Sequence, residues 1–544
     1  MENLTETFIF LTAKFFIFYC LLFLIGRSFV LIINKDKKID NKKILNLDSQ
    51  IIYPIFGLIF VGNFLVFFNF FFPIKSNLTY LFFLIILINI KYPLNLNIFK
   101  KTIAKFPIYI TLLISSSNVY FHYDAGLYHL NNQMLLRESN IILGISNIYG
   151  PYGVGSIYEY ISSFLWLDRS YVLLHFLSLI FIGFFFEIIY DLIFNNEINY
   201  LKNIGISLLI FSIFDNFGYS GGRNGLIYIQ GIGKQDVAVA VLFVFTAVLI
   251  IYNVKNKKFD SFNFLIVSYL SLFIYQLKVS GVMIFSFFIF YVVYLIKEDK
   301  LQKIKFSDFL LFSTIGIFWL LKSLLNTGCL IFPLAASCFD QFSWSNEQNI
   351  KVIQDISIGY SNSYNFGDSL VNWFKDYTAI NMNFTILLNY TISYLIIAFV
   401  VFSKTTINNS TVRNKNFSIR TILFLNILFY LNFGPDPRYI MAIQILLIAL
   451  IGFNRFPRVN FSKQFLQFLF IIAVVSFVRL DSYRNFDFFY HPNYTIPEPE
   501  VSKLYDRTFP KDGDQCWANI ECSPNRDNFT ITESKYFKIV NLDN

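Results

Sequence analysis

The sequence predicts an all-α protein that crosses a membrane about fourteen times. Hydrophobic residues make up 55% of the 544 residues and charged residues only 15%, a balance that a soluble domain cannot bury. Apolar runs long enough to cross roughly 30 Å of hydrocarbon recur along the chain. Basic residues cluster in the short segments between those runs, as is typical of multi-pass membrane proteins.

The individual spans follow from the apolar runs. The first run, residues 8–33, is too long for a cleavable signal peptide and lacks a small-residue cleavage site, so we expect it to remain as the first span. We expect the later spans at residues 50–72, 78–92, 105–118, 170–194, 203–217, 236–253, 262–277, 279–296, 308–325, 385–403, 420–433, 440–454 and 464–480.

The basic loops set the orientation of the chain. Residues 34–48 carry five lysines directly after the first span, so the positive-inside rule places this loop in the cytoplasm and the N-terminus outside. The later basic clusters fall on the same side when the spans alternate. The net charge of +9 therefore reflects topology, and we expect no nucleic-acid partner. These features predict a multi-pass inner-membrane protein, surrounded by membrane lipids.

Four longer segments lie outside in this topology, and loops of such length are usually functional or bind a partner. They are residues 115–169, 215–235, 326–384 and 481–544. Residues 125–138 have apolar side chains at helical spacing, which predicts a helix on the membrane surface. The chain is thus divided into a transmembrane domain, residues 1–480, and a periplasmic tail, residues 481–544.

Five cysteines indicate how the outer segments are held together. Cys20 lies within the first span, whereas the other four lie outside, where disulfides form. Four cysteines allow three pairings, so the sequence leaves the choice open. Trp517 lies between the last two cysteines, and we favour a disulfide-stapled plug on the outer loops over a sugar-stacking role. The disulfide candidates are Cys329, Cys338, Cys516 and Cys522.

The first outer loop opens with three side chains suited to acid–base chemistry. If a helix begins near Asp124, Tyr128 lies one turn further on the same face and His129 lies beside it. A carboxylate, a phenol and an imidazole together can activate a hydroxyl or hold a divalent metal beside a phosphate. The alternative is that Asp124 only caps the helix.

Four basic residues near the outer ends of spans are candidate ligands of a phosphate. Arg223 and Lys234 lie in a glycine-rich loop whose backbone amides can approach a phosphate, with an ordinary turn as the alternative. Lys278 interrupts an apolar run, where a charge needs a partner or a path to the interface. Arg438 lies in a proline-rich turn and either binds an anion or pairs with Asp436.

Several motifs together resemble an uncharacterised family of bacterial polytopic membrane proteins. The motifs are residues 123–129 (YDAGLYH), 277–281 (LKVSG), 326–333 (NTGCLIFP), 436–439 (DPRY), 514–517 (DQCW) and 521–524 (ECSP). That family is similar to the GT-C glycosyltransferases, multi-pass enzymes that take a sugar from a polyprenyl-phosphate carrier and use an acidic residue in the first long outer loop. The resemblance implies a GT-C-like fold, with Asp124 as the base toward an acceptor hydroxyl.

The resemblance also implies roles for the other candidates. Arg223, Lys278 and Arg438 would stabilise the leaving lipid phosphate as its charge develops. Tyr128 and His129 would orient the acceptor or the carboxylate. Many GT-C enzymes have a second acid next to the first, a position that this chain fills with tyrosine or alanine, so a divalent metal is a candidate cofactor without a clear ligand pair.

The expected function is the transfer of a sugar from a polyprenyl-phosphate donor to a surface glycan or lipid acceptor on the periplasmic side. A glycan polymerase or flippase of surface polysaccharide assembly is the alternative enzyme or transport class, and a non-enzymatic membrane protein is the third. A transporter of another kind would need broken helices and charges deep in several spans, of which the sequence has few.

Overall fold

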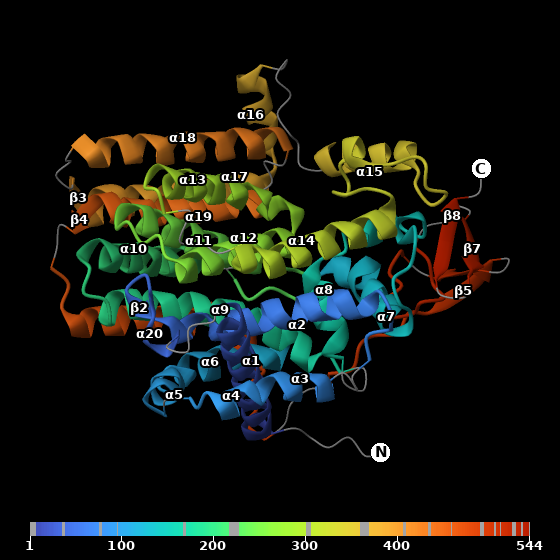
Figure 1. The fold of residues 1–544 in the computed structure, drawn as a ribbon, viewed down its shortest axis with the longest axis horizontal. Helices are drawn as coiled ribbons and strands as arrows, with labels where there is room; N and C mark the ends of the chain where they lie inside the picture. Colours follow the sequence, from blue (N-terminus) through green and yellow to red (C-terminus); the bar gives the residue numbers. More distant parts are fainter. Residues whose placement is uncertain are drawn as a thin grey trace.

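The computed structural model is a bundle of helices with four short β-ribbons at its ends (Figure 1). It describes residues 7–34, 39–75, 79–94, 96–166, 170–216, 228–300, 306–359, 369–405, 410–433, 437–457, 460–489, 494–504, 507–511, 513–524, 529–534 and 537–542.

The helices account for most of the regular structure. They are α1 Phe8–Asn34, α2 Tyr53–Asn69, α3 Thr79–Ile86, α4 Ile88–Lys91, α5 Leu96–Ile103, α6 Phe106–Leu113, α7 Leu130–Glu138, α8 Ile157–Phe164, α9 Val172–Phe194, α10 Asn199–Asn216, α11 Asp236–Lys255, α12 Ser261–Leu277, α13 Ile284–Lys297, α14 Phe306–Thr327, α15 Glu347–Gly359, α16 Leu370–Ala379, α17 Asn381–Leu395, α18 Ser410–Phe433, α19 Pro437–Asn454, α20 Lys463–Phe477 and α21 Leu480–Arg484.

The strands of the described residues form four antiparallel two-stranded ribbons. They are β1 Lys43–Ile44 with β2 Leu47–Asp48, β3 Phe402–Thr405 with β4 Arg455–Pro457, β5 Val501–Leu504 with β6 Arg507–Pro510, and β7 Phe529–Glu533 with β8 Lys538–Leu542. Three of them pair strands that follow each other closely in the sequence, and the β3–β4 ribbon pairs segments about fifty residues apart. The all-helical membrane class is therefore confirmed, with the strands confined to loops and the tail.

The prediction of about fourteen spans is wrong, because fewer helices have the length and the apolar composition that a membrane span needs. Within the described residues, six helical segments are long and apolar enough to cross a membrane, and five more are apolar but shorter. The six are Phe8–Asn34, Ser49–Asn69, Val172–Phe194, Asp236–Lys255, Val279–Lys297 and Phe309–Thr327. The shorter ones are Ser261–Leu277, Leu387–Val401, Ile419–Leu431, Arg438–Asn454 and Lys463–Phe477.

Two of the expected spans, residues 78–92 and 105–118, contain only helices that are too short to cross a membrane. The first is split into α3, of eight residues, and α4, of four. The second yields only the eight residues of α6 before a 3₁₀ turn follows. A helix of eight residues is only about 12 Å long, well short of the hydrocarbon thickness.

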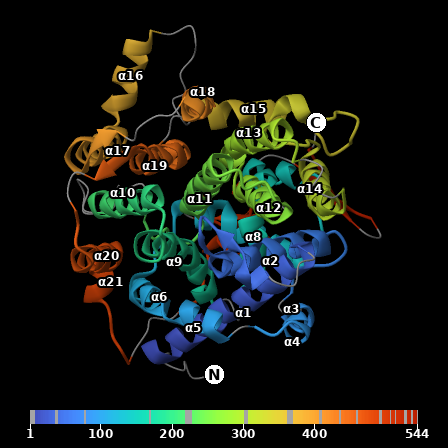
Figure 2. The same ribbon diagram turned by 60° about the vertical axis from the view of Figure 1, so that its left-hand side comes forward.

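Two of the long helices form the centre of the bundle. The apolar windows of α9 and α11 are 94% and 100% buried within the protein, whereas those of α13 and α14 are 33% and 22% buried. Figure 2 shows α9 and α11 surrounded by the other helices. A helix that is apolar on all sides needs either lipid or protein around it. In this fold α9 and α11 are covered by protein, and α13 and α14 present exposed apolar side chains.

The long crossing of α1 against α2 depends on two glycines. A Cβ atom at Gly26 would overlap the backbone oxygen of Tyr53, and one at Gly57 would overlap the backbone oxygen of Leu22. Small residues let two membrane helices approach closely and gain van der Waals contact. The pair therefore packs backbone to backbone and forms a rigid edge of the bundle.

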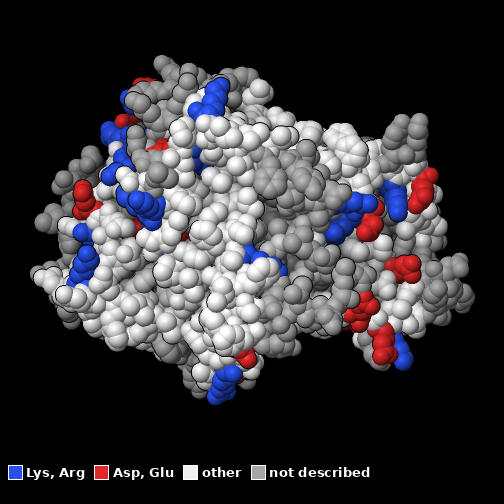
Figure 3. Space-filling model, turned by 90° about the horizontal axis from the view of Figure 1, so that it is seen from below, with Lys and Arg blue, Asp and Glu red and all other residues white. Residues whose placement is uncertain are grey.

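The loops are separated between the two ends of the bundle. Ribbons β1–β2 and β3–β4 lie at one end, and α7, α15 and the C-terminal strands lie at the other (Figure 1). On the face seen in Figure 3, most charged side chains lie toward the two ends and the area between is mainly uncharged. We call the second end, which carries α7, the α7 end.

The helix expected at 125–138 is present but is not an exposed surface helix. A π-helical turn, Ala125–His129, leads directly into α7. Residues Leu130 to Gln133 of α7 are buried, because the helix packs against α8 and receives the tail on its other side. Its polar residues thus point into protein, where they find hydrogen-bond partners.

Both expected disulfides form, with pairing between neighbours in sequence. Cys329 bonds to Cys338 with an S–S distance of 2.06 Å, and Cys516 bonds to Cys522 with 2.03 Å. Cys20 is a free thiol within α1. The disulfide-stapled C-terminal tail is therefore confirmed, and the Cys329–Cys338 disulfide closes a loop within residues 326–384.

Candidate functional site

Two loops meet at the α7 end and position the first carboxylate. The Ile232 amide donates to the Tyr120 carbonyl at 3.0 Å, and the His122 amide donates to the Ile232 carbonyl at 3.1 Å. Gly233 has φ +90° and sits so close to Ala125 that an added Cβ would lie 2.8 Å from the alanine Cβ. The loop before α11 is thus fixed beside the loop that opens the first outer segment.

Asp124 forms an ion pair across these two loops. Lys234 Nζ donates to Asp124 Oδ2 at 2.5 Å, and the two side chains are 7% and 22% exposed respectively. Burial raises the pKa of the Asp124 carboxyl, but Lys234 outweighs it and leaves that pKa below its usual value. Burial and the charge of Lys278 lower the pKa of Lys234. Burial and Lys234 together lower the pKa of His122, beside Asp124, to about 4, so this imidazole is neutral at pH 7.

A second ion pair lies next to the first. Asp236 is the first residue of α11, and Lys278 directly follows α12; the two side chains form an ion pair in which Asp236 is almost fully buried. The other oxygen of Asp236, Oδ2, is buried without a hydrogen-bond donor among the described residues. A buried carboxylate oxygen in this condition is a ready acceptor for a hydroxyl group.

Arg438 and Tyr439, at the start of α19, complete the charged cluster. Lys278 Nζ lies 4.7 Å from the centre of the Tyr439 ring, and the Arg438 guanidinium carbon lies 5.3 Å from it. The positive charge of Arg438 also acts on Lys234 and lowers its pKa. Three cations therefore converge on the two carboxylates, and we call Asp124, Lys234, Asp236, Lys278 and Arg438 the charged cluster.

The charged cluster unites predicted residues that lie more than three hundred positions apart. Asp124, Lys234, Lys278 and Arg438 were each candidates on the sequence alone, and the fold brings all four together. Arg223, the remaining predicted cation, lies outside the described residues, as does Asp436, the predicted alternative partner of Arg438.

His129 and Tyr128 belong mainly to a neighbouring network. His129 Nδ1 lies 2.6 Å from Glu159 Oε1, and Asn132 hydrogen-bonds the other oxygen of Glu159. The Tyr128 ring lies 4.1 Å from the His129 ring, and burial with the nearby charge of Asp124 raises the pKa of the Tyr128 phenol. The imidazole is therefore directed to Glu159, while the buried phenol lies near enough to Asp124 and Glu159 to feel their charges.

Three charged residues of this region were missed by the sequence analysis. Asp236 directly follows the glycine-rich loop, and Glu159 is a lone acid in an otherwise uncharged α8, which were the available signals. Lys322 is buried within α14, where its ammonium donates to the Gly155 carbonyl at 2.5 Å and lies 4.2 Å from the Trp319 ring centre. An ionisable residue within an apolar helix indicates a functional position, and this signal is present in the sequence at Lys322.

The disulfide-stapled loop of the tail covers the first outer loop. The Trp517 amide donates to the Gly126 carbonyl at 2.8 Å, and the Trp517 and Phe121 rings meet edge to face at 5.5 Å. Gln515 donates its side-chain amide to the Tyr123 carbonyl at 3.0 Å. These contacts support the plug over a sugar-stacking role, because the indole is already packed on protein.

The residues around Asp124 do not fit a divalent metal. No group of three or more His, Cys, Asp or Glu side chains suited to a metal occurs in the described ranges. The nearest candidate ligands are Asp124 and His122, but Lys234 already holds the carboxylate and would repel a second cation. We therefore derive no chemical step through a metal.

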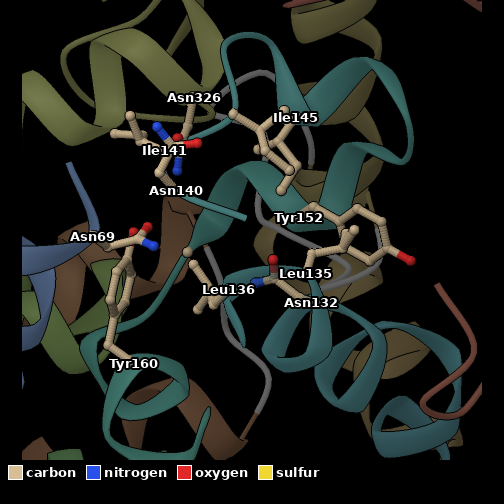
Figure 4. Close-up of a pocket in the computed structure, with 12 residues that line it drawn as sticks. Asn69, Asn132, Leu135, Leu136, Asn140, Ile141, Ile145, Tyr152, Tyr160 and Asn326 are labelled. Carbon is tan, nitrogen blue, oxygen red and sulfur yellow. The ribbon is translucent and has the colours of Figure 1, made fainter. Parts of the chain in front are cut away.

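A small cavity lies behind the Glu159 network. Asparagines from α2, α7 and α14 surround it, together with Tyr152 and Tyr160 (Figure 4). Its volume is about 300 Å³ including open solvent. The part of this space that is free to a water molecule is only about 10 Å³. It has room for about one ordered water, which amide groups hold well, and it is too small for a sugar.

The fold and the charged cluster define an all-helical membrane protein with a polar site at one end of its bundle. The chain belongs to the family described as a domain of unknown function, DUF8201, whose model matches residues 8–447. The match includes the whole charged cluster and ends before the stapled tail. Neither the curated proteins nor the solved structures contain a significant match to the chain.

Proposed function

We propose that the protein is a GT-C-like glycosyltransferase of the bacterial inner membrane, which moves a sugar from a polyprenyl-phosphate donor to a surface glycan or lipid acceptor on the periplasmic side. The observation that supports this proposal is the convergence of two carboxylates and three cations at one end of the helical bundle. Acid–base transfer from a phosphate leaving group needs both kinds of charge within a few ångströms.

The cations suit the leaving group. When the bond from the sugar carbon to the phosphate oxygen breaks, its electron pair and a negative charge remain on the lipid phosphate. Lys234, Lys278 and Arg438 are placed to stabilise that charge. Lys278 is held in place by Asp236, so its ammonium is fixed before the donor binds.

The Asp124–Lys234 pair suits a resting state of the same enzyme. A carboxylate held by an ammonium has a lowered pKa and is a weak base. A donor phosphate competes for Lys234, and its arrival releases Asp124 to accept the proton of the acceptor hydroxyl. The acceptor oxygen then bonds to the sugar carbon. Base activation thus depends on donor binding, which limits wasteful hydrolysis of the donor.

The test is the substitution Asp124→Asn, with Asp48→Asn as the matched control. Asp48 also forms a lysine ion pair, with Lys101 at 2.7 Å, but outside the charged cluster. We expect Asp124→Asn to reduce sugar transfer by about a hundredfold or more, with normal protein abundance, and the control to transfer normally. Surface glycan profiles and transfer from a purified lipid-linked donor are the measurements. Unchanged transfer by Asp124→Asn would rule out the proposed base.

A polymerase of lipid-linked repeat units is the second candidate, because the same cations would hold the lipid phosphate of a growing chain. The two functions differ in their products. Loss of a transferase leaves a truncated unit, whereas loss of a polymerase leaves complete single units on the lipid. The length of the lipid-linked product in the Asp124→Asn strain separates them.

A further inference from the structure

A second charged region lies in a pocket formed by three loops, away from the charged cluster. Five lysines line it, together with two phenylalanines, an aspartate and an asparagine. They are Lys42, Lys43, Lys257, Lys258, Lys300, Phe259, Phe262, Asp260 and Asn263. We call this the lysine pocket; its volume is about 940 Å³ including open solvent.

The lysine pocket has an excess of positive charge. Asp260, the one acid that lines it, caps the N-terminus of α12. Its carboxylate accepts hydrogen bonds from the Asn263 backbone amide at 2.9 Å and from the Asn263 side-chain amide at 2.6 Å. Lys257 pairs with Glu298 at 2.9 Å, near the rim. Within the described part of the chain, the pocket lysines thus outnumber Asp260 and Glu298, and like charges in a concave site repel each other unless an anion is bound.

The position of the lysines goes beyond what orientation alone requires. Cytoplasmic loops carry basic residues to set topology, but that rule does not require the residues of separate loops to face one hollow. Here the loop after α1, the loop between α11 and α12, and the segment after α13 supply the five lysines. The Tyr291 hydroxyl of α13 donates to the Lys258 carbonyl at 3.1 Å and ties two of these segments together.

An exposed apolar surface leads away from the lysine pocket. The α13 side chains Ile289 and Ile296 are 61% and 54% exposed, and Val293 lies between them on the same helix. α13 ends three residues before Lys300. Lipid acyl chains would cover this surface in a membrane, so a headgroup in the pocket would have its tails alongside α13.

We propose that the lysine pocket binds the phosphate headgroup of an anionic phospholipid from the leaflet at that end of the bundle. The ammonium groups contact the phosphate oxygens, and the buried rings of Phe259 and Phe262 form the apolar wall of the pocket. Basic pockets between membrane helices are suited to anionic headgroups. Bound lipid would join the three loops and stabilise that end of the protein independently of any transfer chemistry.

The experiment compares two triple substitutions in the full-length purified protein. Lys43→Gln, Lys258→Gln and Lys300→Gln remove pocket charge; Lys91→Gln, Lys100→Gln and Lys101→Gln remove equal charge from residues that do not line the pocket. Native mass spectrometry then measures retained phosphatidylglycerol against phosphatidylcholine. We expect about a hundredfold weaker phosphatidylglycerol retention for the pocket variant, since each lysine near an anionic surface contributes about a factor of five.

Further controls test whether the pocket variant is folded, whether the effect is specific to the pocket and whether the bound phosphate belongs to a lipid. The pocket variant should elute as a monodisperse peak, and Lys→Arg at the same three positions should restore lipid retention. Equal loss in both Gln variants would overturn the proposal in favour of general charge attraction. Inorganic phosphate or pyrophosphate that raises the melting temperature as much as phosphatidylglycerol does would overturn the lipid as the source of the phosphate.

Discussion

Asp124 keeps its negative charge because Lys234 lies 2.5 Å away, on a loop that is separated from Asp124 in the sequence by four helices, α7 to α10. The neighbouring imidazole of His122 is neutral at pH 7, because burial and the positive charge of Lys234 both lower its pKa. At the residue scale the site therefore holds an ionised carboxylate beside a neutral imidazole. One buried oxygen of Asp236 has no hydrogen-bond donor among the residues that the structure describes.

The His122 imidazole gives a pH dependence that stability measurements can detect. Its folded pKa of about 4 lies below the ordinary value of 6.5, so the unfolded chain binds more protons between those two values. Stability therefore falls as the pH is lowered from 6.5 to 4. We expect His122→Gln to show a smaller fall, measured as melting temperature in detergent at pH 7 and pH 4.5. Identical falls in both proteins would contradict the buried neutral imidazole.

At the scale of single elements, close approach of helices depends on glycines. The α1–α2 crossing places Gly57 against the backbone of Leu22, whereas Gly316 of α14 has nothing within 4 Å of an added Cβ. An added methyl group would therefore clash with backbone at Gly57 but would have free space at Gly316. In a membrane, lipid would fill the space beside α14.

Gly57→Ala and Gly316→Ala form a matched pair. Gly57→Ala forces two backbones apart, and we expect it to lower the free energy of unfolding by about 1 to 3 kcal/mol. Gly316→Ala removes only glycine flexibility, so stability should stay constant or rise by up to about 1 kcal/mol. Unfolding titrations in mixed micelles measure both. A Gly57→Ala protein as stable as the parent would show that the crossing is looser than described.

At the scale of the whole molecule, the tail joins parts of the chain that are nearly four hundred residues apart. Trp517 and Gln515 hold the loop that carries Asp124, and the Val540 amide donates to the Leu143 carbonyl at 2.9 Å. The Cys516–Cys522 disulfide keeps the Trp517 loop in shape. The tail is thus a structural part of the first outer segment, although the family match ends before it.

Removal of this disulfide tests the coupling. Cys516→Ser with Cys522→Ser should destabilise the tail by about 2 kcal/mol, as expected for so short a loop. It should also reduce the sugar transfer that we propose, because the Asp124 loop loses its cover. The paired control is Cys329→Ser with Cys338→Ser, which opens a loop elsewhere in the outer segments. Protease sensitivity of the tail and transfer activity are the readouts, and equal effects of the two double variants would contradict a specific role of the tail.

The candidate residues of the site could be found in the sequence, but their partners could not. Charges such as Lys278 stand out in apolar surroundings, and Asp124 opens a long loop, so each was noticeable alone. Hydropathy carries no information on which loop meets which. His129 was expected beside Asp124 by helical spacing, yet a buried glutamate on α8 holds it, because an imidazole inside protein needs its own hydrogen-bond partner.

The sequence by itself determined the class of the molecule: apolar runs and basic loops require helices in a membrane, since lipid cannot satisfy open backbone groups. It also determined which cysteines lie outside the spans. Tertiary structure decided the lengths of the helices, the pairing of the cysteines and the meeting of Asp124, Lys234, Lys278 and Arg438. These depend on packing between distant segments, whereas hydropathy reports only how each segment meets lipid or water.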